Sequence, residues 1–218
     1  MNQASTLARR PAGALVASLG DAAGAKLPSY VTRDQARAII NAAETTRDRL
    51  LLEGCWQTGG RVSEVLRLRP CDVHRREGAL VLTNLKQRRR ALRQKLVYVS
   101  PELVRDLATY ARDAGLSPMS YFFQSQKSDG QPMSRQHAWR LIQQHAQRAG
   151  VAVVGGDGQL RPATGLDFRH GAAVHQLRAG VPLTEVQQQL GHARIDTTTI
   201  YTKLTNPERR SYADRVEW

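Results

Sequence analysis

The feature that most constrains the fold of this chain is a change of pattern between residues 79 and 100. The runs ALVLTN and KLVYVS are short and contain β-branched or aromatic residues, and the very basic segment KQRRRALRQ joins them. This arrangement predicts a β-hairpin with a long tip. Elsewhere apolar residues recur at helical spacing. We therefore expect a mainly α fold with one small antiparallel β-sheet, in the α+β class.

Capping and stop signals indicate where the helices lie. Thr32 and Gln35 form a capping-box pattern, and the pair Gly59-Gly60 is typical of a turn that ends a helix. A glycine-rich loop, VAVVGGDGQLRPATG, is expected before the penultimate helix. The expected helices begin at Thr32 and continue with 50–56, 63–68, 101–115, 134–149, 169–179 and 182–190.

The charge balance indicates the kind of partner. Lys and Arg number 32 against 19 Asp and Glu, and the pI is about 10.6. Such an excess favours a polyanion, and nucleic acid is the commonest one. With no run of 18 apolar residues, no transmembrane helix is expected.

The cysteines and acidic residues show no sign of a metal site. Cys55 and Cys71 both lie among residues that look buried, and neither has a partner at zinc-ligand spacing. Two cysteines make no disulfide framework, which favours a reducing compartment. The Asp and Glu residues have no metal-site spacing either.

Residues 1–29 loosely imitate a secretory signal, because Arg9 and Arg10 precede an apolar stretch. Gly13, Gly20 and Asp21 interrupt that stretch. We interpret 1–29 as a mobile N-terminal arm.

Candidate chemistry is concentrated near the C-terminus, in LGHARIDTTTIYTKL, which contains His192 and Tyr201. A tyrosine hydroxyl has a pKa of about 10, so it attacks a phosphodiester only where cations stabilise the developing charge. Arg61, in TGGRVSEVLRL, and Arg169, in TGLDFRHGAAVHQL, are candidate cations. The planar fork of an arginine gives two parallel hydrogen bonds to a phosphate.

Together these segments resemble the catalytic domain of the tyrosine recombinases, the phage integrase family. The resemblance covers about residues 30–205, and in size the chain is similar to the short fimbrial-switch invertases. It implies that Arg61 and Arg169 hold the scissile phosphate, that Lys86 protonates the leaving 5′ oxygen, and that His192 donates a hydrogen bond. Tyr201 would form a 3′-phosphotyrosyl link, with no metal and no cofactor.

Each candidate also has a plainer interpretation. Arg61 suits a surface arginine paired with Glu64, and Arg169 suits an exposed helical arginine. The order of the whole motif set favours the site. The remaining cations of the predicted hairpin are expected to grip DNA phosphates without chemistry: Arg88, Arg89, Arg90, Arg93 and Lys95.

Leu166 departs from the family pattern, which has a histidine or lysine three residues before the second arginine. Leucine cannot accept a proton, so activity is expected to be reduced, or His170 or His175 takes the role. We also expect the Leu166 side chain to occupy an apolar pocket. A non-catalytic DNA-binding regulator on the same fold is an alternative function, as is a DNA-relaxing enzyme of the type IB topoisomerase kind.

The resemblance also implies partners. The expected substrate is double-stranded DNA at paired sites, bound by a homotetramer in the bacterial cytoplasm. Thirty residues cannot build the core-binding domain that usually precedes the catalytic one, so a partner recombinase is a further candidate. Residues 206–218 are expected to form a tail or short helix that contacts a neighbouring subunit. Integration, excision, inversion and resolution all remain open as outcomes.

Overall fold

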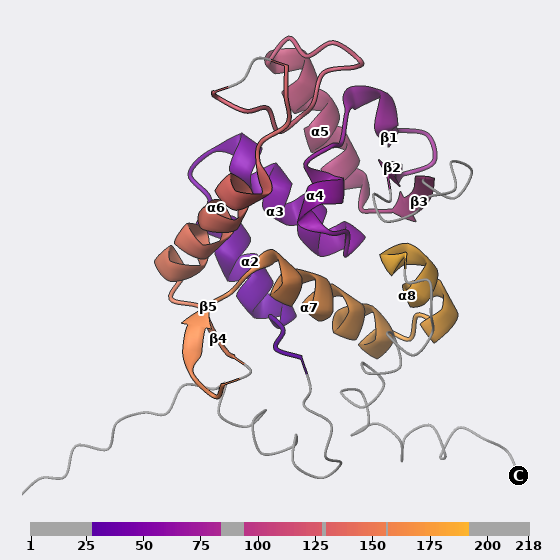
Figure 1. Cartoon of the computed structure of the whole chain (residues 1–218). Coiled ribbons are helices and arrows are strands. Elements are labelled where there is room, and N and C mark those ends of the chain that lie inside the picture. Colours follow the sequence, from indigo (N-terminus) through magenta and orange to yellow (C-terminus); the bar gives the residue numbers. More distant parts are fainter. Residues whose placement is uncertain (1–27, 84–93, 128–129, 156, 192–218) are drawn as a thin grey trace, which may run out of the picture.

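The computed structural model describes residues 28–83, 94–127, 130–155 and 157–191. Within these ranges the chain is mainly helical, as the sequence predicts, and it has two small antiparallel sheets where one was expected (Figure 1). The helices are α2 (Arg33–Asn41), α3 (Thr46–Thr58), α4 (Val62–Val65), α5 (Pro101–Asp113), α6 (Arg135–Arg148), α7 (Gly165–Arg178) and α8 (Leu183–Leu190), with a 3₁₀ turn at Pro70–Asp72. The strands are β1 (Val73–His74), β2 (Ala79–Thr83), β3 (Gln94–Tyr98), β4 (Ala152–Val154) and β5 (Leu160–Pro162).

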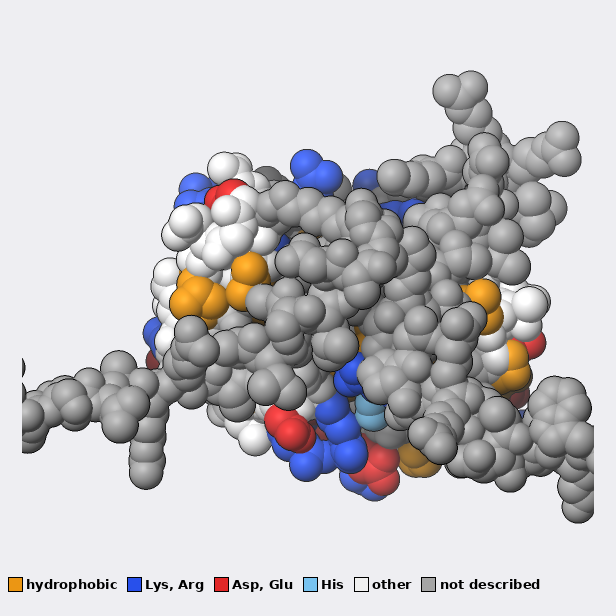
Figure 2. Space-filling view, turned by 90° about the horizontal axis from the view of Figure 1, so that it is seen from below, with side chains coloured by type: hydrophobic (Ala, Val, Ile, Leu, Met, Phe, Trp, Pro, Cys, Tyr) orange, Lys and Arg blue, Asp and Glu red, His pale blue; other side chains and the backbone are white. Residues whose placement is uncertain are grey.

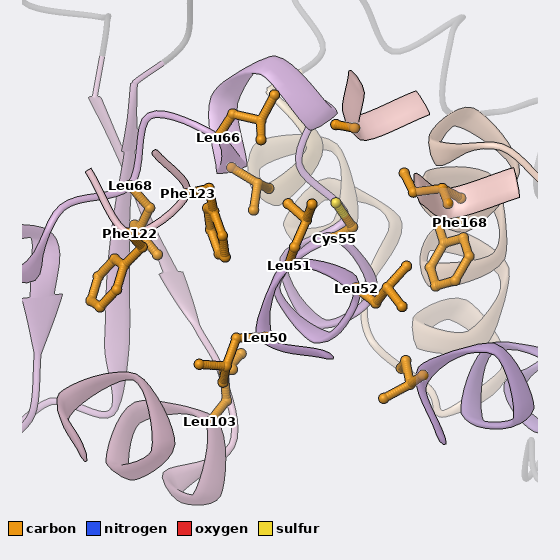
Figure 3. Close-up of a cluster of buried hydrophobic side chains, with 14 of the residues drawn as sticks. Leu50, Leu51, Leu52, Cys55, Leu66, Leu68, Leu103, Phe122, Phe123 and Phe168 are labelled. Carbon is orange, nitrogen blue, oxygen red and sulfur yellow. The ribbon is translucent and has the colours of Figure 1, made fainter. Parts of the chain in front are cut away.

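Helix α3 occupies the centre of the described fold and packs against α2, α5 and α7. Three consecutive leucines, Leu50, Leu51 and Leu52, are all buried on it, so the helix is covered on several sides. Figure 3 shows these leucines with Cys55 and Phe168 in the central cluster. Burial on several sides explains why α3 lacks the one-sided apolar pattern of a surface helix.

The predicted hairpin is confirmed, and a third short strand extends it. β2 pairs antiparallel with β3, and β1 pairs with the other edge of β2. Leu80 lies opposite Val97 and Leu82 lies opposite Lys95. Leu80, Leu82 and Val97 face the core, which fixes the register because a shift of one residue would expose them.

Two expectations about helix starts were wrong. Helix α3 begins at Thr46, where the Thr45 side chain caps it, rather than at residue 50. Helix α7 begins at Gly165, four residues before the expected start at Arg169. The Asp167 carboxylate accepts hydrogen bonds from the backbone and hydroxyl of Thr164, which stabilises that earlier start.

The glycine-rich segment before α7 also differs from expectation, since it contains the β4–β5 hairpin. The exposure of Cys71 is a second difference. Cys55 is buried as expected, whereas Cys71 lies at the surface after the 3₁₀ turn begins. No helix in the described part of the chain is long and apolar enough to span a bilayer.

Candidate active site

The ends of two helices form the frame of the site. Helix α3 ends at Gly59, with a φ of 56°, and α8 ends at Gly191, with a φ of 67°. Glycine adopts this left-handed conformation without steric cost, which suits both positions. A Cβ on Gly59 would crowd the Leu190 side chain, so the two helix ends lie against each other. Both ends present backbone carbonyls that no helical N–H can reach.

Arg169 bridges these two helix ends. Its Nη1 donates to the Gly59 carbonyl at 2.8 Å and its Nη2 donates to the Leu190 carbonyl at 2.8 Å. The residue is 4% exposed, so the interpretation as an exposed helical arginine was wrong. A cation is favourable here because the C-terminal end of a helix carries partial negative charge. Arg169 is therefore built into the fold at the point where α3, α7 and α8 meet.

Arg61 lies two residues after Gly59, at the start of α4. Its Nη1 donates to Oε1 of Glu64 at 2.8 Å, and its backbone N–H donates to Oε2 at 3.2 Å. The Glu64 side chain is fully buried, whereas that of Arg61 is 27% exposed. The expected Arg61–Glu64 ion pair is confirmed, but its carboxylate lies inside the protein.

Lys95, on β3, reaches the same carboxylate from the hairpin. Its Nζ lies 3.3 Å from Oε2 of Glu64 and donates to the Gln189 carbonyl at 2.7 Å. Its side chain is 12% exposed. Lys95 thus points into the fold, whereas the sequence placed it with the phosphate-gripping residues of the hairpin.

The pKa values reflect a shortage of negative charge in this cluster. The pKa of Lys95 is lowered to about 8, mainly by burial, which outweighs the attraction of Glu64; the positive charges of Arg169 and Arg61 lower it further. Burial raises the pKa of Glu64, but Lys95 and Arg61 together hold it below its ordinary value. Among the described residues, Arg61 and Lys95 share the Glu64 carboxylate, and the charge of Arg169 adds to the repulsion on Lys95, so an added anion would relieve that repulsion.

Leu166 lies on the first turn of α7, one helical turn before Arg169. It is 60% exposed, so the expectation of an apolar pocket around it was wrong. Gly165, just before it, has no room for a Cβ because Val62 of α4 packs against it. That close approach places the Leu166 position beside the helix that Arg61 begins.

His170 and His175 are the candidate substitutes for the histidine or lysine that the family has at the position of Leu166, and their surroundings differ. Burial lowers the pKa of His170 to about 4, which makes its imidazole a weak base. His175 stacks on Trp56, with ring centroids 5.7 Å apart, beside a groove of about 380 Å³.

A network that the sequence did not reveal holds the start of α7. The buried carboxylate of Asp167 accepts from both terminal nitrogens of Arg161, at 2.8 and 2.9 Å, and from the Ser29 hydroxyl at 2.6 Å. These bonds lower the pKa of Asp167 against the effect of burial. The spacing of Thr164 and Asp167 is that of a helix cap, and it was the signal that could have revealed the early start of α7.

Several predicted site residues lie outside the described ranges, and Figure 2 draws all residues outside those ranges in grey. Described Lys and Arg side chains appear near its lower centre beside a His and beside acidic groups. Among described residues, no three His, Cys, Asp or Glu side chains are grouped as a metal site. The expected tail at 206–218 and all but the end of the expected arm also lie outside the described part. The predicted site residues outside it are Lys86, Arg88, Arg89, Arg90, Arg93, His192 and Tyr201.

The sequence profile of the phage integrase family matches residues 29–208. This chain belongs to the phage integrase family. Its relatives include XerA of Pyrococcus horikoshii, 26% identical over 191 residues, and XerD of Neisseria meningitidis, 34% identical over 189 residues. These alignments cover 88% and 83% of this chain, but only 62% and 60% of the relatives. The phage integrase chain described here therefore spans about six tenths of their length.

Solved structures of similar proteins have the same fold. A XerA recombinase crystal structure matches with a TM-score of 0.69 and 28% identity, over 88% of this chain and 67% of that one. A XerH site-specific recombinase bound to palindromic difH substrate matches with a TM-score of 0.70 and 21% identity, over 89% and 55%. The second likeness shows that this phage integrase family member shares the fold.

Proposed function

We propose that this chain is the catalytic domain of a site-specific DNA recombinase. It cuts and rejoins duplex DNA through a 3′-phosphotyrosyl intermediate, with Tyr201 as the nucleophile. The observation that carries the proposal is the meeting of Arg61 and Arg169, which are far apart in sequence. Arg169 hydrogen-bonds Gly59, two residues before Arg61, and the positive charges of both arginines lower the pKa of Lys95.

The charge of this cluster suits phosphoryl transfer. In-line attack on a phosphodiester spreads negative charge over the non-bridging oxygens, and cations that are already fixed stabilise it without reorganisation. Arg169 is held by two helix ends and Arg61 by a buried carboxylate. Both are therefore positioned before DNA arrives, and the excess positive charge favours a phosphate over a neutral ligand.

The remaining groups complete the reaction. The Tyr201 oxygen attacks phosphorus, its proton passes to water, and the bond to the 5′ oxygen breaks. Lys86 donates a proton to that 5′ oxygen, while His192 donates a hydrogen bond to the phosphate. The reverse attack by a 5′ hydroxyl of another strand restores the phosphodiester, so the bond energy is conserved in the ester and no nucleotide cofactor is consumed.

A covalent-capture experiment tests this function and identifies the DNA site together. The protein is incubated with nicked duplexes whose central sequence is randomised, and adducts that survive denaturation are recovered and sequenced. The wild type is expected to form an adduct on a defined set of sequences. Tyr201→Phe is expected to form none and to bind the recovered sequence as before, while the control Tyr212→Phe forms it normally.

The other outcomes have distinct meanings. An adduct in Tyr201→Phe would exclude Tyr201 as the nucleophile. Sequence-specific binding without any adduct would identify a non-catalytic regulator instead. Relaxation of a supercoiled plasmid that lacks the recovered sequence would identify a topoisomerase-like enzyme.

We further propose that recombination uses four copies on two DNA sites in the cytoplasm, with a partner recombinase among the candidate subunits. XerH, which has the same fold, was solved on its DNA substrate. Light scattering of the protein with the recovered duplex tests the tetramer, since a complex of one protein copy per duplex would contradict it.

The hairpin arginines Arg88, Arg89 and Arg90 are proposed to grip phosphates. Their combined replacement by Ala is expected to weaken binding to all sequences alike. It should also flatten the salt dependence of log affinity by about 0.9 for each phosphate that the protein no longer neutralises. Loss of sequence preference at an unchanged salt slope would show that they read bases.

A further inference from the structure

Lys95 joins three elements that are distant in sequence. It lies on β3, pairs with Glu64 of α4 and donates to the Gln189 carbonyl near the end of α8. Gln189 in turn donates from its side chain to the Gln57 carbonyl of α3 at 3.1 Å. Lys95 therefore bonds Glu64, which follows the end of α3, and Gln189, which lies near the end of α8. These are the two helix ends that hold Arg169.

The position is an unfavourable one for a lysine. The side chain is 12% exposed and is repelled by Arg61 and Arg169. A lysine that only gripped DNA would gain from an exposed position on the hairpin surface, as the neighbouring Leu96 and Tyr98 side chains are exposed. Packing alone would be served as well by an apolar side chain of similar length. A buried charge here therefore indicates a functional requirement.

We propose that Lys95 is a positioning residue that sets the Arg61 guanidinium through Glu64 and fixes the spacing between Arg61 and Arg169. This inference rests on the proposed recombinase function.

The contacts explain how this would work. Glu64 has two carboxylate oxygens, and Oε1 holds the Arg61 guanidinium while Oε2 faces Lys95 and the Arg61 backbone. With Oε2 anchored, the carboxylate cannot rotate away from the guanidinium. The second bond, to Gln189, fixes the end of α8, whose Leu190 carbonyl accepts from Arg169. A single ammonium group therefore constrains both arginines.

Single-turnover cleavage of the recovered nicked duplex, measured over a range of DNA concentrations, tests this role. The variants are Lys95→Met, Lys95→Arg and the matched control Lys127→Met, which removes an exposed lysine. Lys95→Met is expected to lower the maximal rate about 10- to 100-fold, the size of effect that a small misplacement causes. Its half-saturating DNA concentration and salt slope should stay within about twofold of the wild type.

Two further comparisons separate positioning from packing. Lys95→Arg keeps the charge and is expected to recover most of the rate, which an effect of side-chain volume would not allow. In an Arg61→Ala background, Lys95→Met is expected to add little, because it acts through Arg61. Additive losses, or a raised half-saturating concentration with an unchanged maximal rate, would overturn the proposal.

A measurement without DNA keeps the inference separate from the proposed function. The Nε–H resonance of Arg61 in ¹⁵N NMR is expected to shift in Lys95→Met and to stay in place in Lys127→Met. If the wild type cleaves no DNA, the recombinase function fails, and a shifted resonance still supports the positioning of Arg61. An unmoved resonance in a folded Lys95→Met protein overturns it.

Discussion

Gly165, the first residue of α7, packs directly against the side chain of Val62, the first residue of α4. The two helices begin side by side because glycine leaves no Cβ between them. Arg61 immediately precedes one helix start and Arg169 lies one turn into the other. The distance between the two proposed phosphate-binding arginines therefore depends on a contact that contains neither of them.

Gly165→Ala is expected to lower both stability and cleavage. Alanine in an unobstructed helix is favoured over glycine by about 1 kcal/mol. Here the added methyl overlaps Val62, and overpacking of this kind costs about 1–3 kcal/mol. Urea unfolding checks the sign, with the exposed neighbour Leu166→Ala as control. A stabilised Gly165→Ala protein would show that α7 moves away from α4 without strain.

The two arginines are expected to differ in their effect on stability. Arg169→Ala leaves two helix-end carbonyls without their donor in a buried place, which costs on the order of 2–4 kcal/mol. Arg61→Ala leaves Glu64 still paired with Lys95, so about 1 kcal/mol is expected. Chemical unfolding of both variants measures this order. Equal losses would contradict the view that Arg169 is part of the frame.

The sequence predicted the elements but not the way charges are shared between them. Caps at Thr32, Ser100 and Ser134 are local signals, and all three are present in the structure. The inward direction of Lys95 was not predictable, since it depends on the register of the hairpin and on where α8 ends. Neither property is encoded in the residues that flank it.

The same limit explains the error at Leu166. Its apolar character suggested a pocket, but the exposure of a side chain depends on what packs against it, and Leu166 is 60% exposed. The early start of α7 was predictable in principle from Thr164 and Asp167. The contacts of Asp167 with Arg161 and Ser29 were not, because Ser29 lies far away in sequence.

Lys95 is expected to make stability rise with pH above 8. Its pKa is about 8 in the folded protein and 10.5 ordinarily, so between these values the unfolded chain binds a proton that the folded chain does not. Stability then increases with pH across this window, reaching its full value above 10.5 and its lowest value below 8. Urea unfolding of the wild type and Lys95→Met from pH 7 to 10.5 measures the difference. Parallel curves would show that the Lys95 pKa is not lowered.

Leu166→His is expected to speed cleavage if the recombinase lacks a proton-transfer group. Because the position is exposed, the imidazole stays hydrated and titrates near about 6.5. General-base help is typically worth about 10²–10⁴, and an exposed, unoriented imidazole should supply about tenfold. Single-turnover rates from pH 5.5 to 8, with Leu166→Gln as control, check this. An equal gain in the Gln variant would assign it to polarity and not to proton transfer.

The bond between Arg169 and Gly59 joins residues 110 apart in the sequence, and that between Ser29 and Asp167 joins residues 138 apart. Contacts of this range form late, because the intervening chain must first be ordered. During synthesis, a ribosome that has released α2 to α5 has made Arg61 but none of the elements that carry Arg169. The nascent chain therefore lacks Arg169 until α7 has been made, and Arg169 has both of its helix-end partners only once α8 has followed.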